Sequence, residues 1–63
     1  MNSTMNPLKP VKLIKVRIPY TTAFGVQMQN SRFPISIETA RHIELIVPET
    51  NERVIFSRKE VII

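Results

Sequence analysis

The sequence has no cysteine, no tryptophan, no aspartate, a single glycine and a single histidine. Without cysteine, the chain forms no disulfide bond and offers no thiolate ligand to a metal ion. One glycine is too few for a Gly-rich phosphate-binding loop or a dinucleotide-binding motif. One histidine without any aspartate does not provide the base and the orienting acid that a nucleophilic hydroxyl needs. We therefore expect a non-catalytic protein without a bound cofactor.

The five glutamates and the histidine are too dispersed for a paired-carboxylate or metal site. Glu38, His42 and Glu44 would be the ligands close together in sequence, which is too few for a metal ion held on a strand. Glu49 and Glu52 flank a predicted turn instead of facing one pocket. We interpret the glutamates as solvated charges that keep the protein soluble, and we expect no metal site.

Long hydrophobic runs are also missing. No apolar segment approaches the roughly 18 residues of a membrane span, and Met1–Pro10 lacks the apolar stretch of a secretion signal. We expect a cytoplasmic protein with no membrane contact and no evident small-molecule substrate. Residues 1–10 are predicted to be a flexible N-terminal segment, because they are polar, contain two prolines and show no alternation. Residues 11–63 are predicted to form one domain.

Hydrophobic residues make up 43% of the 63 residues, which is enough for a packed core. A core this small rarely contributes more than about 3–5 kcal/mol, and natural domains of this size add disulfides, a metal or a partner subunit. Since cysteine is absent, the remaining stability must come from self-association or from an unusually well-packed barrel. We expect a homo-oligomer.

The amino-terminal half contains three segments that alternate like strands. In Val11–Tyr20, the even positions from 14 to 20 are apolar, while Lys15 and Arg17 point the other way. Phe24–Gln29 alternates well enough for a second strand, in which the lone Gly25 indicates a bulge or a close backbone approach. Phe33–Glu38 follows a turn and is predicted to be a third strand, at the edge of the sheet.

Ile37–Val47 allows two interpretations. An apolar residue at every third position fits one face of a helix. Against this, His42–Val47 alternates and is rich in β-branched residues, residues 48–51 have the composition of a turn, and Arg53–Ser57 is a convincing return strand. We favour the hairpin because it explains both halves at once, and it leaves room for one short helical turn near residues 38–43.

Together these segments predict an all-β or mainly β fold. Five short strands with brief connections close most economically as a small barrel, because closure removes exposed sheet edges. The apolar tail 61–63 would dock in this sheet. We therefore predict a five-stranded SH3-like or Sm-like barrel over residues 11–63.

Charge is segregated along the chain. All five charged residues among the first 34 are basic, all five glutamates lie in the last 29, and the net charge is +4. Clusters of Lys and Arg bind phosphate backbones without needing any base contact. Single-strand binders also display aromatic rings on which bases stack. The candidate nucleic-acid-binding residues are Lys12, Lys15, Arg17 and Arg32 for phosphate contacts, with Tyr20 and Phe24 as stacking platforms.

Each part of this candidate site has a simpler explanation. Burial in the core is the favoured alternative for Tyr20 and Phe24. The basic face would also serve solubility alone, which we weigh equally with a binding role. If the last strand lies beside the first, Arg58 and Lys59 would extend the basic patch.

We expect a small, basic accessory or regulatory protein that binds DNA or RNA, of the kind encoded by phages and plasmids. The alternative is an adaptor or inhibitor of the same type that binds protein through an aliphatic sheet surface, alone or as a homodimer. In that case the basic half would steer an acidic protein partner. The many isoleucines favour this alternative, because one small barrel interior does not readily hide them all.

Overall fold

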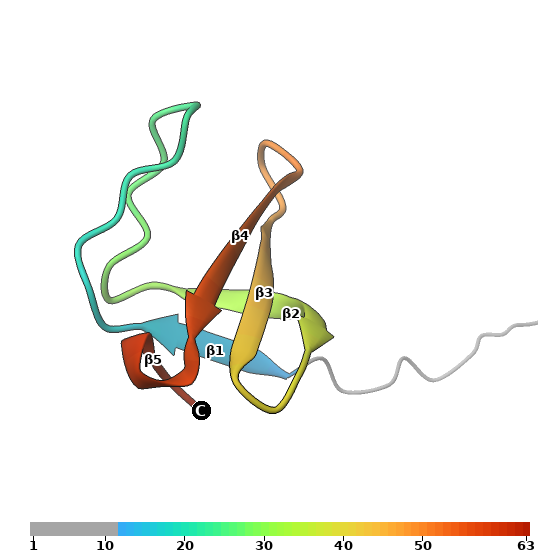
Figure 1. Ribbon diagram of the computed structural model, residues 1–63. Helices are drawn as coiled ribbons and strands as arrows, with labels where there is room; N and C mark the ends of the chain where they lie inside the picture. The colour runs from blue at the N-terminus through green and yellow to red at the C-terminus, as the bar shows by residue number, and fades with distance from the viewer. Residues whose placement is uncertain (1–11) are drawn as a thin grey trace, which may run out of the picture.

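Five antiparallel strands form one curled, half-barrel sheet in the computed structural model, which describes residues 12–63 (Figure 1). The strands are ordered β4-β3-β2-β1-β5 across the sheet. The mainly β prediction is confirmed, whereas the predicted flexible segment 1–10 lies outside the described residues. The elements are β1 (Leu13–Val16), β2 (Arg32–Glu38), β3 (His42–Val47), β4 (Glu52–Ser57), the 3-10 helix η1 (Arg58–Glu60) and β5 (Val61–Ile62).

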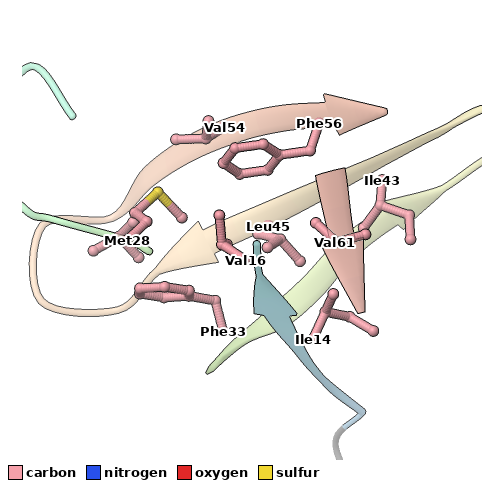
Figure 2. Packing of buried hydrophobic residues seen from close by; sticks show 10 residues of the cluster. Ile14, Val16, Met28, Phe33, Ile43, Leu45, Val54, Phe56 and Val61 are labelled. Carbon is pink, nitrogen blue, oxygen red and sulfur yellow. The ribbon is translucent and has the colours of Figure 1, made fainter. Parts of the chain in front are cut away.

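Alternation along the strands sends one set of side chains into the curl of the sheet. These side chains form the hydrophobic core. The core also contains Met28, which comes from the loop between β1 and β2 and is fully buried (Figure 2). All of its members are apolar, so hydrophobic burial holds the two halves of the sheet together. The core consists of Ile14, Val16, Met28, Phe33, Ile43, Leu45, Val47, Val54, Phe56 and Val61.

β2 is the central strand of the sheet, and it pairs with a different neighbour along each half. Leu13 of β1 is opposite Pro34, and Leu45 of β3 is opposite Ile35. Pro34 therefore lies where β2 passes from one partner to the other. The prediction of an edge strand at 33–38 is wrong, since the edges of the described sheet are β4 and β5.

A β-bulge in β2 changes which face its last residues occupy. The register is Ile35 opposite Leu45 but Ile37 opposite Glu44, so one extra residue stands between them. Without the bulge, Ile37 would be opposite the buried Ile43 and would face the core. The bulge instead turns Ile37 to the outer face, where 52% of it is exposed. Of the two alternatives that the sequence indicates at Gly25, a bulge or a close backbone approach, the bulge is wrong, because the bulge of the sheet lies in β2.

Residues 17–31 form a long irregular loop in place of the predicted strand at Phe24–Gln29. The chain reverses there, because Gly25 has a φ of 89° and its N–H donates to the Thr22 carbonyl at 2.9 Å. Only glycine adopts such a positive φ without strain. The predicted first strand Val11–Tyr20 is correspondingly shorter and ends at Val16, and its residue 11 is not described.

β2 and β3 are joined by a tight hairpin turn. The short helical turn that we considered near residues 38–43 is not present there. The Thr39 N–H donates to the His42 carbonyl at 2.9 Å, and the His42 N–H donates to the Thr39 hydroxyl at 3.0 Å. The single helical turn of the described chain is η1, between β4 and β5. The predicted hairpin of β3 and β4 is confirmed, as is the docking of the apolar tail, which pairs with β1 as β5.

Glu52 fixes the tip of the long loop to the start of β4. Its Oε2 accepts a hydrogen bond from the Phe24 N–H at 3.1 Å. Desolvation is the largest influence on this carboxyl and raises its pKa, but hydrogen bonds outweigh it and leave the pKa below the usual value of 4.5. The donors are the side chains of Thr50 and Thr22 and the backbone N–H groups of Phe24 and Ala23.

Replacing Glu52 with glutamine should lower stability at neutral pH and flatten its loss in acid. Because the pKa is lower in the folded protein, the folded state binds fewer protons than the unfolded chain. The stability from Glu52 is therefore fully present above a pH of about 4.5 and is lost as the pH falls through the lowered pKa. Thermal melts across this range measure the effect. Glu49→Gln is the control, and a Glu52→Gln curve parallel to that of the wild type would contradict the prediction.

Candidate nucleic-acid interface

Lys15 and Arg32 lie directly opposite each other on the outer face of the sheet. Lys15 is flanked in β1 by the fully buried Ile14 and Val16, so its own side chain points outward. The register pairs Lys15 with Arg32 of β2 on one side and with Ile62 of β5 on the other. Like charges in this position repel each other and destabilise a sheet. The fold thus holds two cations side by side at a cost.

Arg17 continues this basic surface toward η1. Its backbone N–H donates to the Glu60 carbonyl at 2.8 Å, and its Nη1 donates to the Lys59 carbonyl at 3.1 Å. The guanidinium therefore lies against the backbone of the turn that carries Lys59, whose side chain is exposed. We call the surface formed by Lys15, Arg17, Arg32 and Lys59 the basic surface.

No glutamate of the described residues forms an ion pair with the basic surface. Within residues 12–63 the one ion pair joins Arg58 to Glu38, with a distance of 2.8 Å between Nη2 and Oε2. The Glu60 carboxylate accepts a hydrogen bond from the Ser57 N–H at 2.9 Å, and Glu52 binds the loop tip. The charges of the basic surface are thus available to an anion from solution.

Lys12 is separated from the basic surface, at the opposite end of β1 from Arg17. Its charge acts on Glu38, whose pKa lies below the usual value. The largest cause is the hydrogen bond from Arg58, desolvation opposes it, and the charges of Lys12 and Arg58 lower the pKa further. The structure therefore brings together Lys15, Arg17 and Arg32 of the predicted set, but not Lys12.

The two predicted stacking rings have different surroundings. Tyr20 is 40% exposed and packs edge-to-face on Phe56, with the ring centroids 5.4 Å apart and the planes at 78°. Phe24 is 74% exposed at the tip of the long loop, so the favoured expectation of burial in the core is wrong for this ring. Figure 1 shows this loop and the β3–β4 turn projecting to the same side of the sheet.

A shallow hollow of about 460 Å³ lies beside Arg32. It separates the long loop from the β3–β4 turn and presents both apolar and hydrogen-bonding groups, which suits a flat polar ring such as a nucleobase. Its lining residues are Val26, Gln27, Ser31, Arg32, Phe33, Pro48 and Glu49.

Sequence reasoning assigned Arg58 and Lys59 to the basic patch on the condition that the last strand lies beside the first. β5 does pair with β1, so the condition is met. Lys59 lies beside Arg17, but the Arg58 guanidinium turns away and binds Glu38 and the carbonyls of Thr39 and Ala40. A basic residue that has an internal hydrogen-bonding role looks the same in sequence as one that does not.

The described part of the chain contains no cluster of three or more potential metal-ligating side chains. It also contains no helix with the length and apolar character needed to cross a membrane. Comparisons with protein-family models, with curated proteins and with solved structures gave no match to this chain. The interpretation of the basic surface therefore depends on its own geometry and charge.

Proposed function

We propose that this protein is a non-catalytic nucleic-acid-binding protein that contacts phosphates through the basic surface. The observation that carries this proposal is the cross-strand pair of Lys15 and Arg32, with which no carboxylate among the described residues forms an ion pair. A sheet selected for stability alone would place opposite charges at such a pair. Two adjacent cations gain instead from a polyanion, because phosphates displace their counterions and remove their repulsion.

Phe24 supports a single-stranded target. Its ring is held out from a loop tip that three kinds of contact keep in place, namely the turn at Gly25, the bond to Glu52 and the buried anchor Met28. An exposed ring on an anchored loop is typical of surfaces on which unpaired bases stack. The hollow beside Arg32 would receive a second base along the strand.

The arrangement of the strands supports an SH3-like barrel as the fold. β5 pairs with β1, the connection between β1 and β2 is long, and η1 joins β4 to β5. In small barrels of this kind, loops at one end commonly carry the binding surface. We propose that the long loop and the β3–β4 turn, which project to the same side of the sheet, serve this role here (Figure 1).

Replacing Lys15 and Arg32 with glutamine should weaken binding to a labelled single-stranded oligonucleotide and reduce its salt dependence. Each phosphate contact contributes about 0.7 to the slope of log affinity against log salt, so the slope should fall by about 1.4. Fluorescence anisotropy at several salt concentrations measures this slope. Lys12→Gln is the matched control, because it removes the same charge from the other end of β1 and should change the slope much less.

The second candidate is an adaptor that binds an acidic protein, and the exposed Ile62 and Ile63 next to Lys15 favour it. Pull-down from a cell lysate, with and without nuclease, separates the two. Capture that is lost on nuclease treatment supports the nucleic-acid function. Capture of a protein that survives nuclease, together with a salt slope near zero for the oligonucleotide, supports the adaptor.

A further inference from the structure

The outer face of β2, β3 and β4 carries an apolar pair around a carboxylate. Glu44 of β3 is opposite Ile37 of β2 on one side and opposite Ile55 of β4 on the other. Ile37 is 52% exposed and Ile55 is 64% exposed, which are large fractions for aliphatic side chains of a sheet. Ile37 occupies this face only because of the bulge in β2. We call this row the Ile37–Ile55 face.

The carboxylate at the centre of this face lacks a hydrogen-bond donor. Glu44 Oε1 is shielded from solvent and has no partner among the described residues. Such a group costs stability, because it has lost water without gaining a protein donor. A small hollow of about 80 Å³ adjoins it, lined by Ile37, Thr39, His42, Glu44 and Ile55. A side chain that carries a hydrogen-bond donor on an aliphatic stem would bring a donor to this carboxylate and would also fill the hollow.

The same face presents a cation that has no acidic partner in the described chain. Arg53 and Ile55 alternate in β4 with the buried Val54 and Phe56. The Arg53 side chain therefore points outward, as that of Ile55 does. The register places Arg53 opposite Ile46, one row from Glu44. The face therefore contains apolar surface, one unpaired carboxylate and one unpaired guanidinium, so it is complementary in charge to a copy of itself.

We propose that the Ile37–Ile55 face binds a second copy of this chain in a two-fold symmetric dimer. A two-fold axis that places Arg53 of one copy on Glu44 of the other also makes the reciprocal pair. Ile55 is opposite Glu44 and two residues from Arg53, so the two copies of Ile55 meet near the axis. The dimer buries the exposed aliphatics and brings a guanidinium to the carboxylate of Glu44. It also provides the stability that a cysteine-free core of this size lacks.

This inference does not depend on nucleic-acid binding. The basic surface lies on β1, the start of β2 and η1, whereas Arg53, Glu44 and Ile55 are on β3 and β4. Dimerisation would leave two basic surfaces free. Each proposal can therefore fail without the other.

Charge exchange within the face tests the dimer directly. Sedimentation equilibrium of the wild-type chain should show a monomer–dimer equilibrium with a dissociation constant in the micromolar range, as small interfaces give. Glu44→Arg and Arg53→Glu should each raise that constant at least about tenfold, because each creates two repulsive pairs across the axis. The double variant Glu44→Arg/Arg53→Glu should restore it to within about threefold of the wild type.

Two further variants separate interface effects from folding effects. Ile55→Glu should give a folded monomer with an unchanged far-UV circular dichroism spectrum. Lys15→Glu, a charge reversal on β1 away from the face, should leave the dimer intact. A wild type that stays monomeric at every accessible concentration would overturn the proposal and leave another protein as the occupant of the face. A double variant as weak as the single ones would also overturn it.

Discussion

Replacing Arg58 with alanine should lower the free energy of unfolding by about 2–3 kcal/mol, because hydrogen bonds from a charged donor contribute more than neutral ones. The Arg58 Nε donates to the Ala40 carbonyl at 3.0 Å, and its Nη2 donates to the Thr39 carbonyl at 2.8 Å. These contacts tie η1 to the β2–β3 turn. A domain of this size has a stability of about 3–5 kcal/mol, so the variant should be barely folded.

The backbone contacts should account for most of this loss. The ion pair of Arg58 with Glu38 is more than one-third exposed on both sides, and exposed pairs contribute about 0–1 kcal/mol. Arg58→Lys keeps the charge but cannot form the same fork, so it should recover less than half of the lost stability. Urea unfolding followed by circular dichroism measures these values, with Lys59→Ala as the control on the same turn. A loss below about 0.5 kcal/mol for Arg58→Ala would contradict the assignment.

Replacing Phe24 with alanine should weaken binding to single-stranded nucleic acid by about 10-fold to 100-fold, because base stacking on an aromatic ring contributes about 1–3 kcal/mol. Phe24 is the most exposed of the large hydrophobic side chains in residues 12–63. Removing it should therefore leave the stability of the fold nearly unchanged. Fluorescence anisotropy with the labelled oligonucleotide measures the affinity.

Phe24→Leu distinguishes base stacking from apolar contact. Leucine keeps the apolar surface but has no ring, so it should bind nucleic acid about as weakly as the alanine variant. If Phe24 instead enters an apolar pocket of a protein partner, leucine should retain most of the affinity. An oligonucleotide affinity that Phe24→Ala leaves unchanged would remove the ring from the nucleic-acid site.

Strand patterns in the carboxyl-terminal half were predictable because they are regular. β3 and β4 alternate cleanly between buried and exposed residues, and residues 48–51 have the composition of a turn. The hairpin was therefore correctly preferred to a helix. The bulge and the central position of β2 were not predictable, because both arise from the curl of the sheet. The lone Gly25 correctly indicated an unusual backbone conformation, which the structure shows as a positive φ. A glycine of this kind fits a bulge in a strand and the tip of a loop equally well, so the sequence did not decide between them.

The candidate site was predictable in part for a similar reason. Alternation places Lys15 and Arg17 on one face of a strand, but only the register brings Arg32 opposite Lys15. The separation of Lys12 and the internal role of Arg58 depend on where Glu38 lies after folding. No local pattern in the sequence reports such long-range partners.

A titration of the isotope-labelled protein with a single-stranded oligonucleotide at low salt, followed by amide chemical shifts, tests the central claim most directly. The predicted result is a set of perturbations at β1, the start of β2, η1 and the tip of the long loop, which diminish as salt is added. The Ile37–Ile55 face should be unaffected. Perturbations confined to β3 and β4, or no perturbation at any site, would contradict binding through the basic surface.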